Sequence, residues 1–358
     1  MDELKNKTAK ISNSDWVKII VVLLAAAFAL YRCFLPFRAE YAFREAYNYE
    51  AQAGAQSLSA EVREHALQKS IEKYIKTMRL APWETYYHTN LGRIYENKAR
   101  AAASPEEKLE WIKKAEDIYD FCLKISPTNP WYVMRKSEIY ALYADLESNA
   151  EKKAALIDLR EQKILEAGEL DPNNAIFQLQ VANLYLSKRE FAKAEEKYQH
   201  VLVIDERMGD AYMMLSEMYR TQGDLEQQME MYRLVIEKNP TYKNARLNLG
   251  ILYEQQDKLK EAINLYKEEA LLDKNNEYAF RVLGNACFRD GQWANMEVAF
   301  NRLTIINPSN ADYYLYRAQA QVRLNKTTEA IKSLEAALTL RPDDATIRNN
   351  LNSLKGTN

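Results

Sequence analysis

Arginine and aromatic side chains recur at helical spacing toward the C-terminal end of the chain. The set comprises Tyr278, Arg281, Asn285, Phe288, Arg289, Tyr316, Gln319 and Arg323. Residues three or four positions apart share one face of a helix. Guanidinium groups bind carboxylates through paired hydrogen bonds and stack on aromatic rings. The pattern predicts a surface that binds a peptide with acidic groups, although an ordinary hydrated helix face has a similar composition.

The residue types that usually carry catalysis or bind metals are scattered. The three histidines are His65, His88 and His200, and the three cysteines are Cys33, Cys122 and Cys287. No pair has the short spacing typical of a zinc site, and the sequence has no glycine-rich phosphate loop. No motif places a base beside a nucleophile. We therefore predict that the protein is not an enzyme and has no catalytic, cofactor or metal site.

The charge balance bears on the class of partner. The chain has 358 residues, with 49 Lys and Arg against 51 Asp and Glu, for a net charge of −2. Nucleic-acid-binding domains usually carry a strong basic excess. We therefore expect protein partners and no nucleic acid.

Six of the nine prolines follow a regular spacing. They are Pro82, Pro127, Pro172, Pro240, Pro308 and Pro342, separated by 45, 45, 68, 68 and 34 residues. Because 68 is twice 34, the second half of the chain repeats every 34 residues and the first half every 45. Proline is typical of positions just after a helix. A fixed period of this length predicts a solenoid of stacked helix pairs.

A pattern of small residues lies between these prolines. Gly250, Gly284 and Ala318 recur in the first helix of successive units, where a small side chain lets the second helix approach. Gly223 and Gly291 are expected in the turns between helices, where a positive φ is convenient. These residues resemble the tetratricopeptide repeat (TPR) family over about 173–342. The resemblance implies an all-α, right-handed superhelical solenoid that binds partners and rarely performs chemistry.

The two proline spacings divide the chain. We expect three long units of about 45 residues over 38–172, five regular units of 34 residues over 173–342 and a capping helix over 343–358. In the long units, Ser104 and Pro105 predict a helix start, so that one helix covers 85–102 and the next 105–124.

First helices of successive TPR units line a concave groove, and we expect the arginine and aromatic set to lie there. Met213, Glu217, Arg220, Leu247 and Ile251 are expected to face the same groove. Arg281 and Asn285 also resemble part of the site with which chaperone-binding TPR domains hold a terminal carboxylate. However, Tyr316 stands where that site has an asparagine, so this interpretation is the weaker one.

The N-terminal segment is strongly apolar. Residues 19–31 form an unbroken apolar run, and aromatic residues flank it at Trp16 and Phe34. A membrane helix needs roughly 20 apolar residues, with aromatic and basic residues at both interfaces. We predict one retained transmembrane helix over 16–35, ended or kinked by Pro36, after a cytoplasmic tail over 1–15.

Two alternatives to a retained anchor stay open. The apolar run also has the length of a cleaved signal peptide, and residues 30–33 have the outline of a lipoprotein signal. The flanking charges favour a cytoplasmic N-terminus only weakly, with Lys5, Lys7, Lys10 and Lys18 before the run and three arginines after it.

The long units also show a second resemblance. Pro82-Trp83-Glu84, Leu91-Gly92-Arg93 and Asp171-Pro172-Asn173 look like the TPR region that follows the membrane helices of bacterial O-antigen ligase and polymerase family proteins. That family's catalytic part is a multi-span bundle, whereas this chain has one predicted span. The resemblance therefore implies no catalytic residue, only a bacterial cell envelope.

Together these features predict a single-pass protein of the bacterial plasma membrane with an extracytoplasmic TPR domain. Its function would be that of a scaffold that binds a protein partner, with a possible link to surface polysaccharide assembly. One alternative is a structural protein that assembles with itself as a homo-oligomer. Another is the non-catalytic tail of a split O-antigen ligase-like enzyme.

Overall fold

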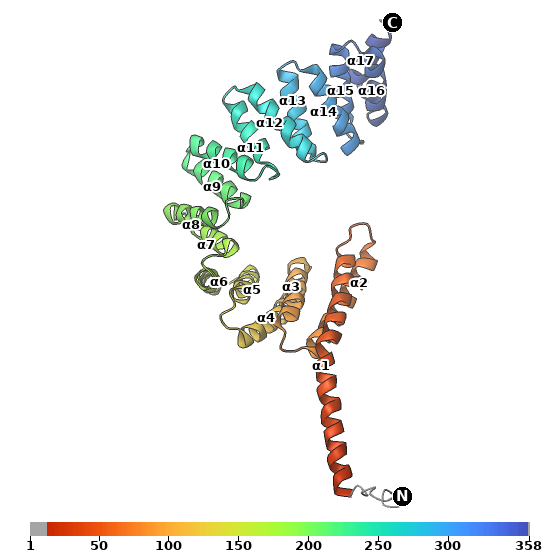
Figure 1. Ribbon diagram of the computed structural model, residues 1–358. Coiled ribbons are helices and arrows are strands. Elements are labelled where there is room, and N and C mark those ends of the chain that lie inside the picture. Colours follow the sequence, from red (N-terminus) through yellow and green to blue (C-terminus); the bar gives the residue numbers. More distant parts are fainter. Residues whose placement is uncertain (1–12, 357–358) are drawn as a thin grey trace, which may run out of the picture. The chain divides into compact units, whose positions relative to one another are not determined.

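The computed structural model describes residues 13–356, which form seventeen helices and no strand (Figure 1). The predicted all-α solenoid is confirmed. The chain divides into two compact units, Met1–Pro172 and Asn173–Asn358. The expected tail over 1–15 lies mostly outside the described residues.

The first unit contains α1 (Asn13–Ala53), α2 (Ala60–Leu80), α3 (Thr85–Ala101), α4 (Pro105–Ile125), α5 (Pro130–Leu146) and α6 (Ala150–Leu170). The second contains α7 (Ala175–Ser187), α8 (Phe191–Ile204), α9 (Gly209–Gln222), α10 (Leu225–Lys238), α11 (Ala245–Gln255), α12 (Leu259–Leu272), α13 (Glu277–Arg289), α14 (Trp293–Ile306), α15 (Ala311–Arg323), α16 (Thr327–Leu340) and α17 (Ala345–Gly356). From α1 to α16, each odd-numbered helix packs against the helix that follows it.

A close crossing between the two helices of a pair holds the second unit together. The first helices carry a small buried residue every 34 positions, namely Ala182, Ser216, Gly250, Gly284 and Ala318. The second helices carry a large buried residue at the same period, namely Tyr198, Tyr232, Tyr266, Phe300 and Leu334. A Cβ atom added to Gly250 would lie 2.4 Å from Tyr266 Cε1, and one added to Gly284 would lie 2.6 Å from Phe300 Cε2. Only a small residue fits there.

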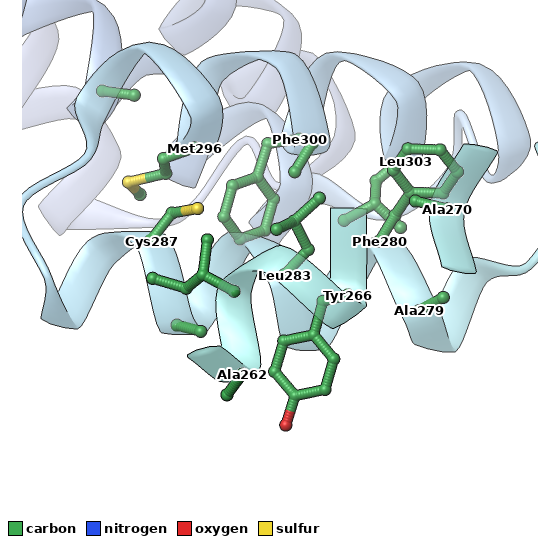
Figure 2. Close-up of a cluster of buried hydrophobic side chains, with 14 of the residues drawn as sticks. Ala262, Tyr266, Ala270, Ala279, Phe280, Leu283, Cys287, Met296, Phe300 and Leu303 are labelled. Atoms are coloured by element: carbon green, nitrogen blue, oxygen red, sulfur yellow. The ribbon is translucent and has the colours of Figure 1, made fainter. Parts of the chain in front are cut away.

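The rings at the Gly250 and Gly284 crossings belong to one apolar cluster. Figure 2 shows Tyr266 and Phe300 within a cluster that also includes Phe280, Leu283 and Met296. Burial is nearly complete, with exposed fractions of 0% for Tyr266 and 1% for Phe300. In the second unit, each second helix also packs against the helix that follows it, so each pair is connected to the next.

The turns between the paired helices repeat the same backbone geometry. Five residues have a positive φ at intervals of 34, namely Arg189, Gly223, Asp257, Gly291 and Asn325, with φ values from 58° to 79°. The prediction for the two glycines is confirmed. The other three turns adopt the left-handed conformation without glycine. Asp257 and Asn325 are residue types that tolerate it, whereas at Arg189 the packing of the helix pair overrides the local preference.

The predicted end of the apolar helix at Pro36 is wrong, because α1 continues through Pro36 to Ala53. Ala39, Ala42 and Ala46 beyond the proline are buried against α2. Ser70 Oγ donates a 2.9 Å hydrogen bond to the Ala46 carbonyl. This packing offsets the backbone hydrogen bond that proline removes. The apolar segment and the first helix of the first unit therefore form one helix.

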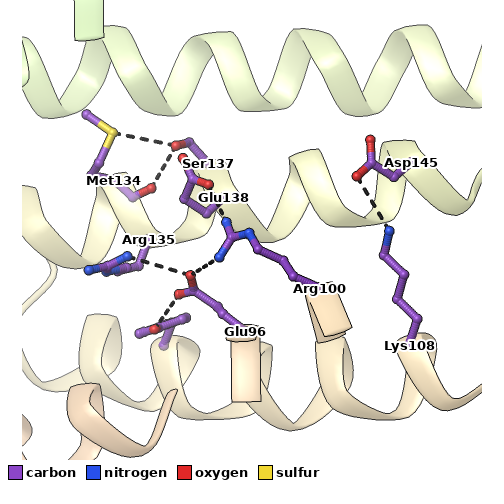
Figure 3. Close-up of polar contacts among 9 residues, drawn as sticks. Glu96, Arg100, Lys108, Met134, Arg135, Ser137, Glu138 and Asp145 are labelled. Carbon is purple, nitrogen blue, oxygen red and sulfur yellow. Dashed lines mark hydrogen bonds and ion pairs between the residues drawn. The ribbon is translucent and has the colours of Figure 1, made fainter. Parts of the chain in front are cut away.

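The first unit buries carboxylates at its helix contacts. Tyr119 Oη donates a 2.5 Å hydrogen bond to Glu96, whose side chain is 1% exposed. Arg100 and Arg135 lie beside the same carboxylate, with nitrogen–oxygen distances of 3.2 and 3.6 Å (Figure 3). Glu50 plays a similar role, because it accepts hydrogen bonds from Tyr74 and Arg93. A buried carboxylate needs such partners to remain charged.

The last helix covers the C-terminal end of the core. Ile347 and Leu351 of α17 pack against Ala318 and Leu334. Arg348, Asn349, Asn350 and Asn352 are exposed. A polar outer face of this kind is typical of a capping helix and disfavours end-to-end stacking.

The crossing geometry predicts a strong effect of a larger side chain at Gly250. A Gly250→Leu variant should lose about 1–3 kcal/mol or more of unfolding free energy, because the added atoms overlap the Tyr266 ring. Urea unfolding followed by circular dichroism measures this. A Gly356→Leu variant is the matched control, since no atom lies within 4 Å of a Cβ at that position. Equal stability of the two variants would contradict the crossing.

The buried His88 predicts a pH-dependent stability. Its ring stacks on Phe121 with centroids 4.6 Å apart, and its Nδ1–H donates to the Glu84 carbonyl at 2.9 Å. Burial lowers the pKa of His88 below 6.5. The unfolded chain therefore binds a proton first as the pH falls through 6.5, and the folded state loses stability from there downward.

A His88→Gln variant should therefore lose less unfolding free energy than the wild type between pH 7.5 and 5.5. Urea midpoints at the two pH values measure the difference. His65 is exposed, and its change to Gln provides the control. Parallel pH profiles for the wild type and His88→Gln would show that His88 does not contribute.

Candidate partner-binding surface

The eight residues singled out in the sequence lie on α13 and α15, which are the first helices of neighbouring pairs, and we call them the α13–α15 surface. All eight are exposed. The aromatic members remain uncovered despite their size, with exposed fractions of 44% for Tyr278, 42% for Phe288 and 41% for Tyr316. Rings of this size are usually buried more fully, so their exposure marks a candidate contact surface.

Contacts at both ends of α13 hold it beside the next pair. Tyr313 Oη donates a 2.5 Å hydrogen bond to Glu277 at the start of α13. Burial and this hydrogen bond raise the pKa of Tyr313 to about 12, so it remains a donor. At the other end, the Phe288 ring meets Trp293 edge to face at 5.8 Å. The Arg323 guanidinium lies 5.3 Å from the centre of the same indole.

Trp293 is the member of this surface that sequence reasoning missed. It begins α14, a second helix, whereas the predicted groove is lined by first helices. The indole nevertheless joins Phe288 of α13 to Arg323 of α15. Its place directly after the Gly291 turn was the available signal.

Two of the three arginines carry charge that no carboxylate neutralises. Arg281 lies over the Tyr278 ring at 5.1 Å, and Arg323 lies over Trp293. Across the described residues, neither forms an ion pair. Stacking orients a guanidinium and leaves its edge donors available to a ligand. These two side chains can therefore bind an acidic group of a ligand without first breaking an internal ion pair.

Arg289 is already engaged within the unit. Its Nη1 lies 3.1 Å from Glu254 Oε2 on α11. Glu254 also interacts with the hydroxyl of Tyr266, the ring at the Gly250 crossing. Arg289 therefore supports the contact between neighbouring pairs, and its exposure alone is not a sign of ligand binding.

The other predicted groove residues have different environments. Leu247 is buried in the core, so the expectation that it faces the groove is wrong. Its side chain fills the space between α11 and the following pair. Glu217 and Arg220 form an ion pair with each other at 2.5 Å along α9, while Met213 and Ile251 are half-buried.

A recess adjoins the α13–α15 surface at its C-terminal end. It has a volume of about 400 Å³ and lies between α15 and α17. Gln319 and Arg323 line it together with Leu315, Val322 and Leu354. A ligand segment could place an apolar side chain there while its acidic group meets Arg323.

The two buried cysteines, Cys122 and Cys287, are poorly suited to nucleophilic chemistry. Burial raises the pKa of Cys122 to about 12 and that of Cys287 to about 11, so both are protonated thiols at neutral pH. Among the described residues, no group of three His, Cys, Asp or Glu side chains has the geometry to hold a metal ion.

Comparison with known families agrees with the helix pairs described above. Four family models match, one described as "YpiA-like, tetratricopeptide repeats" over residues 154–206 and three described as "Tetratricopeptide repeat" over 209–242, 245–278 and 283–345. The chain carries tetratricopeptide repeats. The predicted resemblance to this family is confirmed.

Similar proteins come from bacteria and eukaryotes. The TPR repeat-containing protein YpiA of Bacillus subtilis is 22% identical over 256 residues, which cover 71% of this chain and 58% of YpiA. The human mitochondrial import receptor subunit TOM70 is 23% identical over 78% of this chain and 50% of its own length. This TPR chain therefore spans about half the length of these relatives.

Among solved structures, yeast Tom70 matches with a TM-score of 0.50 and 12% identity over 89% of this chain and 64% of that one. At this identity the match shows the TPR fold alone. The resemblance of the long units to O-antigen ligase and polymerase proteins finds no support in these comparisons.

Proposed function

We propose that this TPR protein is a membrane-anchored scaffold whose α13–α15 surface binds an acidic segment of a partner protein. TPR arrays mediate protein–protein interactions, and the repeats here provide a rigid support for such a surface. The observation that carries the proposal is the pair Arg281 and Arg323, each stacked on an exposed or half-buried ring and neither neutralised by a carboxylate.

The chemistry of this surface suits a peptide ligand. Tyr, Trp and Arg often contribute most of the binding energy at protein interfaces, because they combine apolar area with directed hydrogen-bond donors. Here Tyr278, Tyr316 and Trp293 flank the two arginines, and the recess beside Arg323 adds an apolar pocket. Charge-assisted hydrogen bonds from a guanidinium to a carboxylate would orient the ligand.

The anchor part of the proposal relies on α1. One helix among the described residues, Trp16–Ala53, is long and apolar enough to cross a membrane, and 6% of its most apolar window is buried. Side chains such as Leu23, Leu24 and Phe28 are more than 60% exposed. Because exposure of so much apolar surface to water is unfavourable, we expect this segment to lie in a lipid bilayer.

The same helix fixes the distance between the proposed membrane and the first unit. Leu35 is already buried, and Ala39 is fully covered. The Arg32 guanidinium lies 5.6 Å from the Trp83 ring, at the expected membrane interface. No flexible linker separates the apolar segment from the first unit, so the scaffold would start at the membrane surface. The bacterial envelope and the extracytoplasmic side of the membrane stay predictions from the sequence.

A receptor-like role is compatible with one relative. The name of human TOM70 describes a mitochondrial import receptor subunit, and a receptor needs a recognition surface. The exposed polar face of α17 makes self-assembly by end-to-end stacking the weaker alternative.

Charge reversal tests the binding surface. Arg281→Glu combined with Arg323→Glu should reduce partner capture at least tenfold, because both positions would repel an acidic ligand. A photo-cross-linking residue at Tyr278, in the full-length chain in its native membrane, should yield a covalent adduct with a discrete partner protein. The double variant should lose this adduct, with the largest loss at low ionic strength.

Lys260→Glu combined with Lys332→Glu provides the matched control. Both lysines are exposed on second helices and have no ion pair among the described residues. The control carries the same charge change and should keep the adduct. If both double variants keep it or both lose it while folded, the α13–α15 surface is not the binding site.

Membrane extraction tests the anchor. The mature protein should begin at or near Met1, resist extraction by 1 M salt or carbonate and enter solution only with detergent. Intact-mass spectrometry of the extracted chain identifies its first residue. A chain that starts after Tyr31 and dissolves in salt alone would instead establish a cleaved signal peptide.

A further inference from the structure

We propose a second binding site on the second helices of the array, in a groove between α12 and α14 that takes an acidic amphipathic helix of a partner protein. We call it the α12–α14 groove. It is separate from the α13–α15 surface, because the two share no residue.

The groove has an apolar floor and apolar walls. Ala270, Phe280 and Leu283 form the floor, and the recess has a volume of about 550 Å³. The walls consist of large apolar side chains that are unusually exposed to water. The exposed fractions are 74% for Leu271, 65% for Val298 and 61% for Ile305. Exposed apolar residues gathered around a recess mark an interaction site.

The rim of the groove is cationic. Lys267, Lys274 and Arg302 line it. Among the described residues, no Asp or Glu lines the groove. Lys267 Nζ lies 3.3 Å from the neutral Gln292 amide oxygen. Arg302 donates to the Lys274 carbonyl at 2.7 Å and to the Asn275 amide oxygen at 3.1 Å.

These partners leave the rim charge unbalanced. No ion pair among the described residues involves any of the three cations, whereas the nearby Asp273 and Glu268 are paired with Lys243 and Arg246. An acidic ligand would therefore meet three uncompensated positive charges.

The spacing of the walls suits a helix as ligand. Val298 and Ile305 are seven residues apart on α14, which is about two helical turns or 10 Å. A ligand helix with apolar residues at i, i+3, i+4 and i+7 presents a stripe of the same length. Acidic residues that flank this stripe would meet the lysines and the arginine on the rim.

A second copy of this chain fits the groove less well. A twofold dimer through this face would bring the same patch from each protomer together. The three cations of one copy would then oppose the three of the other. Like charges in a partly buried contact are costly, so a partner of opposite charge is favoured.

A designed peptide tests the site. The probe is a fluorescein-labelled, lactam-constrained 18-residue helix with leucines at i, i+3, i+4 and i+7 and glutamates beside them. Its twin has lysines in place of the glutamates. The full-length chain is held in phosphatidylcholine nanodiscs, which keep detergent out of the groove, and binding is followed by fluorescence anisotropy. The acidic helix should bind at least tenfold tighter than its basic twin, with a difference that shrinks in 0.5 M salt.

Variants locate the binding. Val298→Glu combined with Ile305→Glu should weaken binding of the acidic helix at least tenfold. Lys274→Glu, at an exposed position without an ion pair, should weaken it severalfold without any loss of fold by circular dichroism. Val203→Glu is the matched control, because that exposed valine on α8 lies outside the groove. Arg281→Glu combined with Arg323→Glu should leave this binding unchanged, which separates the two proposed sites.

Three results would overturn the proposal. The first is equal affinity for the acidic and basic helices, and the second is unaltered binding by the Val298→Glu, Ile305→Glu variant. The third is a different occupant. Phosphatidylserine vesicles that bind only when Val298 and Ile305 are intact would show a lipid site. A dimer in sedimentation that these substitutions dissociate would show a self-interface.

Discussion

The contact between a small residue of one helix and a large ring of the next determines how this protein is built. At Gly250 and Gly284 the partner ring lies so close that a single Cβ atom would overlap it. The distance between the two helices of a pair is therefore set by steric contact. Because the second helix that carries the ring also packs against the following pair, a displacement of the helices at one crossing would disturb the packing of the neighbouring pair.

This constraint also explains where recognition can occur. The inner faces of both helices are occupied by the crossing and the core, so ligands can meet only the outward faces. The first helices α13 and α15 present stacked arginines, and the second helices α12 and α14 present an apolar groove with a cationic rim. A rigid array that carries two chemically different surfaces can bind two segments of a partner, which raises the effective concentration of each.

The first unit adds a link to the apolar segment. The helix α1 crosses Pro36 without ending, since Ala39, Ala42 and Ala46 are held against α2. A proline that ends a helix in an isolated peptide can thus lie inside one when packing compensates for the lost hydrogen bond. The buried carboxylate of Glu96 and the half-buried carboxylate of Glu50, each with tyrosine and arginine partners, stabilise the longer helix pairs.

The sequence by itself determined the features that depend on local preference and on spacing. The period of 34 residues, the helix starts at Ser104 and Pro105, the glycine turns and the apolar N-terminal helix could all be predicted, because caps, breakers and periodic apolar residues act within a few positions of the chain. Tertiary structure decided what depends on contacts between helices. It continued α1 through Pro36, placed Leu247 in the core, paired Arg289 with Glu254, imposed a left-handed turn on Arg189, and brought α12 and α14 together around a groove. Sequence spacing alone could not predict these outcomes, since each requires the position of a side chain on another helix.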